Sequence, residues 1–86
     1  MPKFDRDPPE AEKNLRERGI PFEAACDFQM DTAVTVVDSR KDYGEVRYRS
    51  FGFIGDRLHC LVFTLRGDEI RIISLRKANA REIQSL

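Results

Sequence analysis

The sequence lacks long apolar runs, and this absence excludes whole classes of protein. None of its 86 residues fall in an apolar stretch of about 18, the length that a membrane-spanning helix requires. The N-terminal MPKFDRDPP also has no apolar segment of the kind found in signal peptides. We therefore expect a cytoplasmic protein with no membrane partner.

Residues that bind metals or cofactors are equally scarce. Cys26 and Cys60 have neither metal-like nor redox-like spacing, so we interpret them as free thiols. The one histidine, His59, falls within a predicted strand, where we interpret it as a structural residue at the sheet rim. Neither a glycine-rich phosphate loop nor a nucleophile elbow is present. The sequence predicts no metal and no cofactor.

Length and charge bound the remaining possibilities. A chain this short buries only about 60 to 65% of its unfolded surface, so we expect one domain over residues 1–86. Its net charge of zero argues against a general polyanion binder, yet residues 46–86 alone carry a net charge of +4. Either the two halves only attract each other, or the second half binds a polyanion.

The N-terminal part predicts two helices. Asp7 is a suitable N-cap for a helix over residues 8–18, and Gly19 is a suitable stop. Because only Ala11 and Leu15 form its apolar stripe, this helix is expected to cover a sheet edge. A second short helix over residues 21–28 presents one apolar side, formed by Phe22, Ala25 and Phe28.

The rest of the chain predicts a meander of four antiparallel strands. The strands are expected at residues 33–38, 46–54, 57–66 and 69–76. Gly55-Asp56 and Gly67-Asp68 suit two-residue type II′ turns. Asn79 and Glu82 then form a capping box that opens a last short helix, with Ile83 and Leu86 facing inward. The fold class is therefore α+β, with two N-terminal helices, a four-stranded antiparallel sheet and a short C-terminal helix.

Two-residue turns also fix the pairing of the strands. Facing residue numbers sum to 111 across the first hairpin and to 135 across the second, so Thr64 faces both Arg47 and Arg71. Val62 likewise faces Arg49 and Ile73, and His59 faces Gly52 and Arg76. Alternation then places Arg47, Arg49, Thr64 and Arg71 on one face at one end of the sheet.

Apolar residues occur on both faces of this sheet. The face opposite the arginines is the expected core, formed by Tyr48, Leu61, Phe63, Leu65, Ile70 and Ile72. The arginine face continues through Phe51, Phe53, Leu58, Cys60 and Leu75. Because that is more apolar surface than a short helix covers comfortably, either a protein partner or the folded-back last helix is expected there.

Arg47 and Arg71 repel each other unless an anion or a carboxylate compensates their charges. One reading is a solvated end of the sheet held by Glu45 and Glu69. The other is a phosphate site, in which guanidinium groups give bidentate, permanently charged donors.

Several spaced motifs occur together along the chain: DPPEAEKNLRERG at residues 7–19, DSRKDYGEVR at 38–47, Thr64-x-Arg66, RIISLRKA at 71–78, and Glu82. As a set they resemble the BrnT family, the toxins of a type II toxin-antitoxin system with a RelE-like fold. The polar residues that match are Glu45, Arg47, Thr64, Arg66, Arg71, Ser74 and Arg76. Family members often have Lys-His before the helix-ending glycine, where this chain has Glu17-Arg18.

The resemblance implies a small ribonuclease that halts translation and is neutralised by BrnA, an antitoxin that also binds operator DNA. RNA can be cut without metal by its own 2′-hydroxyl group, so we expect Arg47 and Arg71 to clamp the phosphate and Thr64 to orient it, with Glu45 as candidate base. The other predicted RNA-binding residues are Arg49, Arg66, Arg76 and Lys77. A catalytically silent module that holds RNA or a protein on the same face remains an alternative, as does a structural subunit without RNA affinity.

Overall fold

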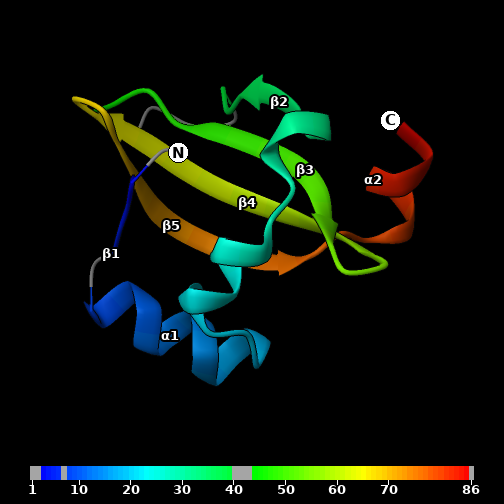
Figure 1. Ribbon diagram of the computed structural model, residues 1–86, viewed down its shortest axis with the longest axis horizontal. Helices are drawn as coiled ribbons and strands as arrows, with labels where there is room; N and C mark the ends of the chain where they lie inside the picture. Colours follow the sequence, from blue (N-terminus) through cyan, green and yellow to red (C-terminus); the bar gives the residue numbers. More distant parts are fainter. Residues whose placement is uncertain (1–2, 7, 40–43, 86) are drawn as a thin grey trace.

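The computed structural model describes the backbone of residues 3–6 and 8–39 and 44–85, and the side chains from residue 9 onward within those ranges. The described residues form two α-helices and two short 3₁₀ helices, which lie around one sheet (Figure 1). In chain order the elements are β1 (Lys3–Arg6), α1 (Pro8–Arg18), the 3₁₀ helices η1 (Phe22–Asp27) and η2 (Met30–Thr32), β2 (Val34–Val37), β3 (Tyr48–Ile54), β4 (Arg57–Arg66), β5 (Glu69–Lys77) and α2 (Ala80–Ser85).

The sheet has five strands in the order β1-β5-β4-β3-β2. The four antiparallel strands β2 to β5 confirm the predicted meander. The prediction missed β1, which pairs in parallel with β5 from Lys3 opposite Glu69 to Arg6 opposite Ile72. The segment KFDR has one apolar residue and no clear period, and its partner strand lies near the other end of the chain. Local sequence therefore gave no signal for it.

Both hairpins have the predicted two-residue turns, closed by Ile54 opposite Arg57 and Arg66 opposite Glu69. Gly55 and Gly67 each have φ near +63°. Among the described residues, none other than glycine has a positive φ. This conformation fits type II′ turns, in which only the first central residue needs φ above zero. The first hairpin has the predicted register from Tyr48 opposite Phe63 to the turn, and the second has it from the turn as far as Phe63 opposite Ile72. Arg47 lies before β3, outside these pairs.

A β-bulge changes the second hairpin beyond that point. Val62 pairs with Ser74 and not with Ile73 as predicted, so every later pair shifts by one residue and His59 faces Lys77 and not Arg76. The shift turns Leu75 away from the arginine face, where it was expected, into the main core, where it is fully buried. Burial of a leucine side chain contributes about 1.5 to 3 kcal/mol, which favours the bulged register.

The main core lies between the sheet and the 3₁₀ segments, which cross in front of it in Figure 1. Phe22, Ala25 and Phe28 are buried there as predicted, but their segment is a 3₁₀ helix and not an α-helix. Residues three apart align along a 3₁₀ helix, so this spacing suits the observed element better. Gly52 admits Phe28 to the sheet, because a Cβ atom there would lie 2.7 Å from Phe28 Cζ.

Helix α1 has the predicted bounds and ends at Gly19, whose φ is +70° and whose N–H donates to the Leu15 carbonyl. The predicted cap Asp7 lies outside the described residues. Of the predicted stripe, Ala11 packs against the main core, but Leu15 is 52% exposed and Asn14 is the buried residue of the helix. Asn14 Nδ2 donates to the Leu75 carbonyl at 2.8 Å, and the Leu75 N–H donates to Asn14 Oδ1 at 3.1 Å. This amide thus replaces a neighbouring strand just beyond the end of β1.

Predictions for the C-terminal helix α2 and for Leu65 are confirmed in one case and wrong in two. The capping box is confirmed, since the Asn79 N–H donates to Glu82 Oε1 and the Glu82 N–H donates to Asn79 Oδ1. The inward placement of Ile83 is wrong, because that side chain is 50% exposed, and Leu86 lies outside the described residues. Leu65 is also wrong as a core residue, at 52% exposed. In the described part of the chain, no helix is long and apolar enough to cross a membrane.

Candidate functional site

Four of the predicted site residues meet where β3 begins: Glu45, Arg47, Thr64 and Arg66. Arg47 Nε lies 3.3 Å from Glu45 Oε2, and Arg66 Nη2 lies 3.7 Å from Glu45 Oε1. Thr64 is buried, and its hydroxyl group donates to the Val46 carbonyl at 2.7 Å. Thr64 therefore fixes the backbone next to Arg47, and its oxygen atom keeps only acceptor capacity for a ligand.

The pairing of Thr64 with Arg71 across β4 and β5 is confirmed. On its other side, the backbone of Arg71 lies opposite Asp5 of β1. Strand β5 is therefore an inner strand, whereas the predicted four-stranded sheet had it at the edge. The Arg71 side chain is half-buried. The structure thus places Arg71 between two strands, whereas Arg47 precedes β3 and faces a cleft.

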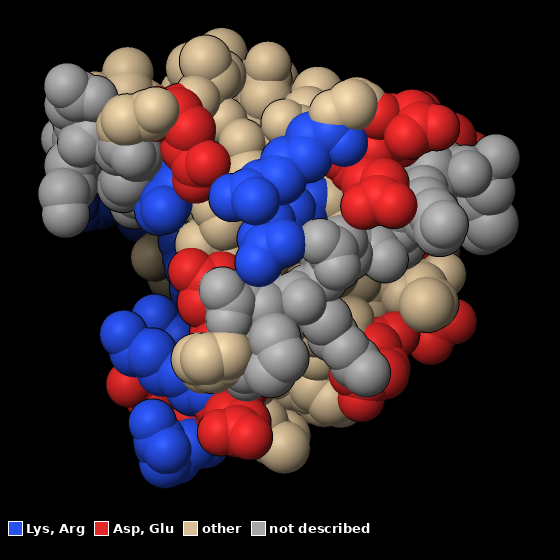
Figure 2. Space-filling model, turned by 90° about the vertical axis from the view of Figure 1, so that its left-hand side faces the viewer, with Lys and Arg blue, Asp and Glu red and all other residues tan. Residues whose placement is uncertain are grey.

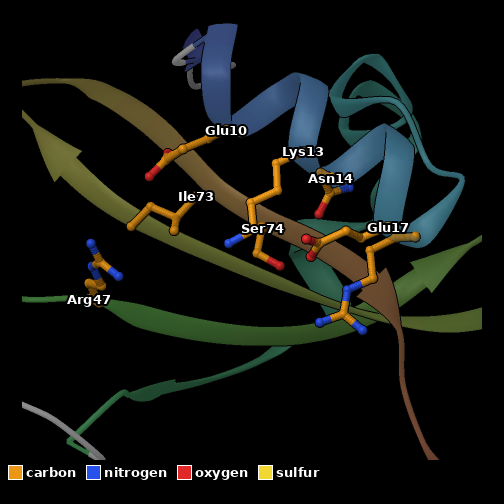
Figure 3. A pocket seen from close by; sticks show the side chains of 8 residues that line it. Glu10, Lys13, Asn14, Glu17, Arg47, Ile73 and Ser74 are labelled. Atoms are coloured by element: carbon orange, nitrogen blue, oxygen red, sulfur yellow. The ribbon is translucent and has the colours of Figure 1, made fainter.

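That cleft, about 280 Å³ in volume, lies between α1 and the arginine face of the sheet. Figure 3 shows Arg47 on one side, the α1 side chains on the other, and Ile73 and Ser74 of β5 between them. A bulge directs two consecutive residues of one strand to the same side, which explains why both β5 residues line the cleft. The helix contributes Glu10, Lys13, Asn14, Glu17 and Arg18.

Sequence reasoning did not select the charged residues of α1 as site residues. Glu10, Lys13, Asn14 and Glu17 follow the spacing i, i+3, i+4 and i+7, which places them along one side of a helix. This polar row could have indicated a site on α1, but whether it forms one depends on which other element it faces. Arg47 lies just before β3, far from α1 in the sequence, so only the tertiary structure brings the two together.

Two of the other predicted RNA-binding residues, Arg76 and Lys77, lie at the end of β5 that is farther from Arg71. Arg76 donates to both carboxylate oxygens of Glu82 at 2.6 and 2.7 Å, and Lys77 is exposed beside it. Five residues along β5 separate Arg76 from Arg71, roughly 16 Å at the usual rise of a strand. Arg49 lies closer, with its Nε 3.9 Å from Asp38 Oδ1 and its guanidinium 5.9 Å from the Phe51 ring centre.

Charges of both signs alternate at the end of the sheet where the β4–β5 hairpin lies. Figure 2 views this end and shows a central band of Lys and Arg side chains with acidic side chains on either side. The ion pairs of Glu45 with Arg47 and Arg66 agree with this mixed pattern. Among the residues that the structure describes, no group of three or more His, Cys, Asp or Glu is arranged to hold a metal ion.

His59 lies away from the cleft. It is 6% exposed, it pairs with Gly52 as predicted, and its Nδ1 lies 2.8 Å from the Arg57 carbonyl oxygen. Neither Cys26, which is exposed, nor Cys60, which is buried, forms a disulfide in the described part of the chain. None of these three residues lines the cleft with Arg47.

The Arg76–Glu82 ion pair should make the free energy of unfolding depend on pH. The hydrogen bonds from Arg76, helped by the Asn79 N–H, lower the pKa of Glu82 from 4.5 to about 2. Because the folded pKa lies below the unfolded one, the stabilisation is present above about pH 4.5 and is lost as the pH falls toward 2. We expect the parent chain to lose about 1 to 2 kcal/mol more of its unfolding free energy than Glu82→Gln over this range, in urea denaturation series. Parallel pH profiles of the two proteins would contradict this assignment.

Comparison with known proteins identifies the family. Residues 7–82 match the family model described as ribonuclease toxin, BrnT, of type II toxin-antitoxin system. The 1.1 Å crystal structure of the Brucella abortus ribonuclease toxin, BrnT, is similar in fold, with a TM-score of 0.61 and 22% sequence identity over 92% of this chain and 99% of that chain. Comparison with curated proteins gave no match. Since the family model covers nearly all of the sequence, this chain belongs to the BrnT family, the ribonuclease toxins of type II toxin-antitoxin systems.

Proposed function

We propose that this chain is an endoribonuclease toxin that cleaves RNA without a metal ion and thereby inhibits translation. Family membership supports the reaction class. The observation that supports the site most directly is the position of Arg47, which lines a cleft together with Lys13, Arg18 and the carboxylates Glu10 and Glu17. Cations and carboxylates within one cleft are the groups that phosphodiester cleavage requires.

In the proposed mechanism the RNA supplies its own nucleophile. The ribose 2′-hydroxyl group attacks the adjacent phosphorus, the P–O5′ bond breaks, and the products are a 2′,3′-cyclic phosphate and a free 5′-hydroxyl group. One carboxylate accepts the 2′-hydroxyl proton, and an acid returns a proton to the departing O5′ atom. Glu45 remains a candidate base, and the cleft adds Glu10 and Glu17 as two more.

Arg47 stabilises the negative charge that develops on the phosphate oxygens. A guanidinium group donates two parallel hydrogen bonds and keeps its charge at every relevant pH. Lys13, on the facing helix, is a further candidate for charge stabilisation or proton donation. Arg71 and Thr64 act from the adjoining strands, and Arg49, Arg66, Arg76 and Lys77 remain candidate contacts to more distant phosphates.

The partner in this proposal is a ribbon-helix-helix antitoxin similar to BrnA, which neutralises the toxin and carries it to operator DNA. Membership in a toxin-antitoxin family supports an antitoxin partner. The RelE-like description of the fold and the identification of the partner as BrnA-like are parts of the same proposal.

A catalytically silent binding module is the second candidate. It is favoured by the ion pairs of Glu45, since a carboxylate held by Arg47 and Arg66 is less available as a base. Such a module uses the same arginines to hold RNA or a protein without cutting it.

Incubation of the purified chain with a long RNA in EDTA separates these two functions. The enzyme is expected to cut the RNA and leave 2′,3′-cyclic phosphate ends, which polynucleotide kinase treatment and end-labelling detect. A binding module leaves the RNA intact but retards it in a gel, with an affinity that falls steeply as salt rises. Cleavage that appears only when a divalent metal is added would disprove the proposed mechanism.

A further inference from the structure

A second groove, about 680 Å³ in volume, lies on the arginine face of the sheet beside α2. We call it the β2–α2 groove and define it by Val34 and Val36 of β2, Arg49 and Phe51 of β3, and Arg81 of α2. Val34 is 48% exposed and Val36 is 40% exposed, whereas Phe51 forms a buried floor. The groove therefore offers aliphatic surface that the chain itself leaves uncovered.

Strand β2 has the character of a strand that a partner covers. It ends the sheet order, and within the described residues no strand lies beyond it. All four residues of its sequence VTVV are exposed, and none is charged or proline. Natural edge strands usually carry a lysine, a proline or a bulge, which prevent unwanted association. An apolar edge without these features fits a surface that is occupied in the working complex.

The charge of the groove indicates the chemistry of its occupant. Arg49 and Arg81 flank the two valines. Glu82 also lines the groove, but Arg76 already binds both of its carboxylate oxygens. Asp38 is buried behind Arg49, 3.9 Å from its Nε atom. The accessible part of the groove is thus apolar with cationic sides, which suits apolar side chains flanked by carboxylates.

Exposed valines also favour a protein over RNA as the occupant. Surfaces that bind single-stranded RNA stack bases on aromatic rings or arginine planes, and the one ring in this groove, Phe51, is 7% exposed. Aliphatic side chains on a sheet edge instead match apolar anchors of a peptide segment.

We propose that the β2–α2 groove is the docking site for an acidic amphipathic segment of the antitoxin, an inference that rests on the toxin function proposed above. Arg49 in the groove and Arg47 in the cleft are two residues apart on the same face of the sheet. A segment seated on Val34 and Val36 therefore lies next to the cleft and blocks the approach of an RNA strand to Arg47. Inhibition then requires no contact with the reacting phosphate site itself.

Two substitutions test the site. Val36→Asp places a charge on the apolar surface, and Arg81→Glu reverses a flanking charge on an exposed helix position. Matched controls are Leu15→Asp and Arg16→Glu, two exposed positions on α1 that do not line the cleft or the groove. The probe is a purified ribbon-helix-helix antitoxin of the BrnA type, titrated by calorimetry. Each groove variant is expected to raise Kd at least about 10-fold and each control less than about twofold.

Further measurements identify the reason for a negative result. Thermal unfolding checks that each variant folds, and RNA cleavage should remain within about twofold of the parent, because neither position lines the cleft. If the parent binds the probe and both groove variants bind it equally well, the docking site is wrong while the proposed function stands. If the variants lose RNA cleavage but keep the probe, the groove binds RNA, and this also overturns the inference.

Two more outcomes count against it. A parent dimer that Val36→Asp converts to a monomer in sedimentation would make a second copy of the chain the occupant. If the parent cleaves RNA but does not bind the probe, the antitoxin part of the proposed function fails, and the docking site fails with it.

Discussion

Replacing Arg47 by alanine is expected to lower the rate constant for RNA cleavage by about 100- to 1,000-fold, the usual effect of removing one donor that stabilises a developing oxyanion. Among the arginines predicted as site residues, Arg47 is the one that lines the cleft, where it faces the side chains of α1. Its loss removes a charged, bidentate donor from the phosphate and leaves Glu45 with Arg66 as a partner. Single-turnover cleavage of one labelled RNA measures the effect without product release.

Three comparisons make this result specific. Arg47→Lys keeps the charge but loses the planar fork, so we expect an intermediate rate. Arg71→Ala should have a smaller effect, because Arg71 occupies an inner strand and does not line the cleft. Arg16→Ala, on the exposed side of α1, is the control for charge alone and should cleave at the parent rate. Equal losses for Arg16→Ala and Arg47→Ala would indicate general electrostatic attraction of RNA and no phosphate clamp.

Replacing Asn14 by alanine is expected to lower the free energy of unfolding by about 2 to 4 kcal/mol, a large effect for one polar side chain. The Asn14 amide makes three hydrogen bonds, to the carbonyl oxygens of Ile20 and Leu75 and from the Leu75 N–H. Asn14 is 6% exposed, and Leu75 is fully buried. Without the amide, both backbone groups of Leu75 lose their partner in a place where water cannot easily replace it.

The control for Asn14 is its neighbour Leu15, whose alanine variant should lose less than about 1 kcal/mol because that side chain is half exposed. Asn14→Asp has the same shape, but it places a carboxylate oxygen against two carbonyl oxygens and should be at least as destabilising as alanine. Urea denaturation followed by circular dichroism measures all three variants. A loss below 1 kcal/mol for Asn14→Ala would show that α1 is held to β5 by other contacts.

Much of the antiparallel sheet could be predicted from local sequence. Glycines at the first turn position determined two-residue turns, and these fixed the pairs Arg49 with Val62 and Thr64 with Arg71. The prediction failed at Ile73, where the bulge begins. A bulge does not alter the local apolar pattern, and its stability comes from burying Leu75 and bonding it to Asn14, which are contacts with distant segments.

Some features of the candidate site could likewise be predicted from the sequence, and others could not. The sequence by itself determined the residue types, the capped helix α1, the turns and the placement of Thr64 beside Arg71, because these depend on backbone preferences and on spacing along one hairpin. Only the tertiary structure decided that β1 adds a parallel edge, that Arg71 lies inside the sheet, and that the polar row of α1 faces Arg47. Those arrangements join segments that are far apart in the sequence, and their free energy comes from burial and hydrogen bonds that exist only after the whole chain has folded.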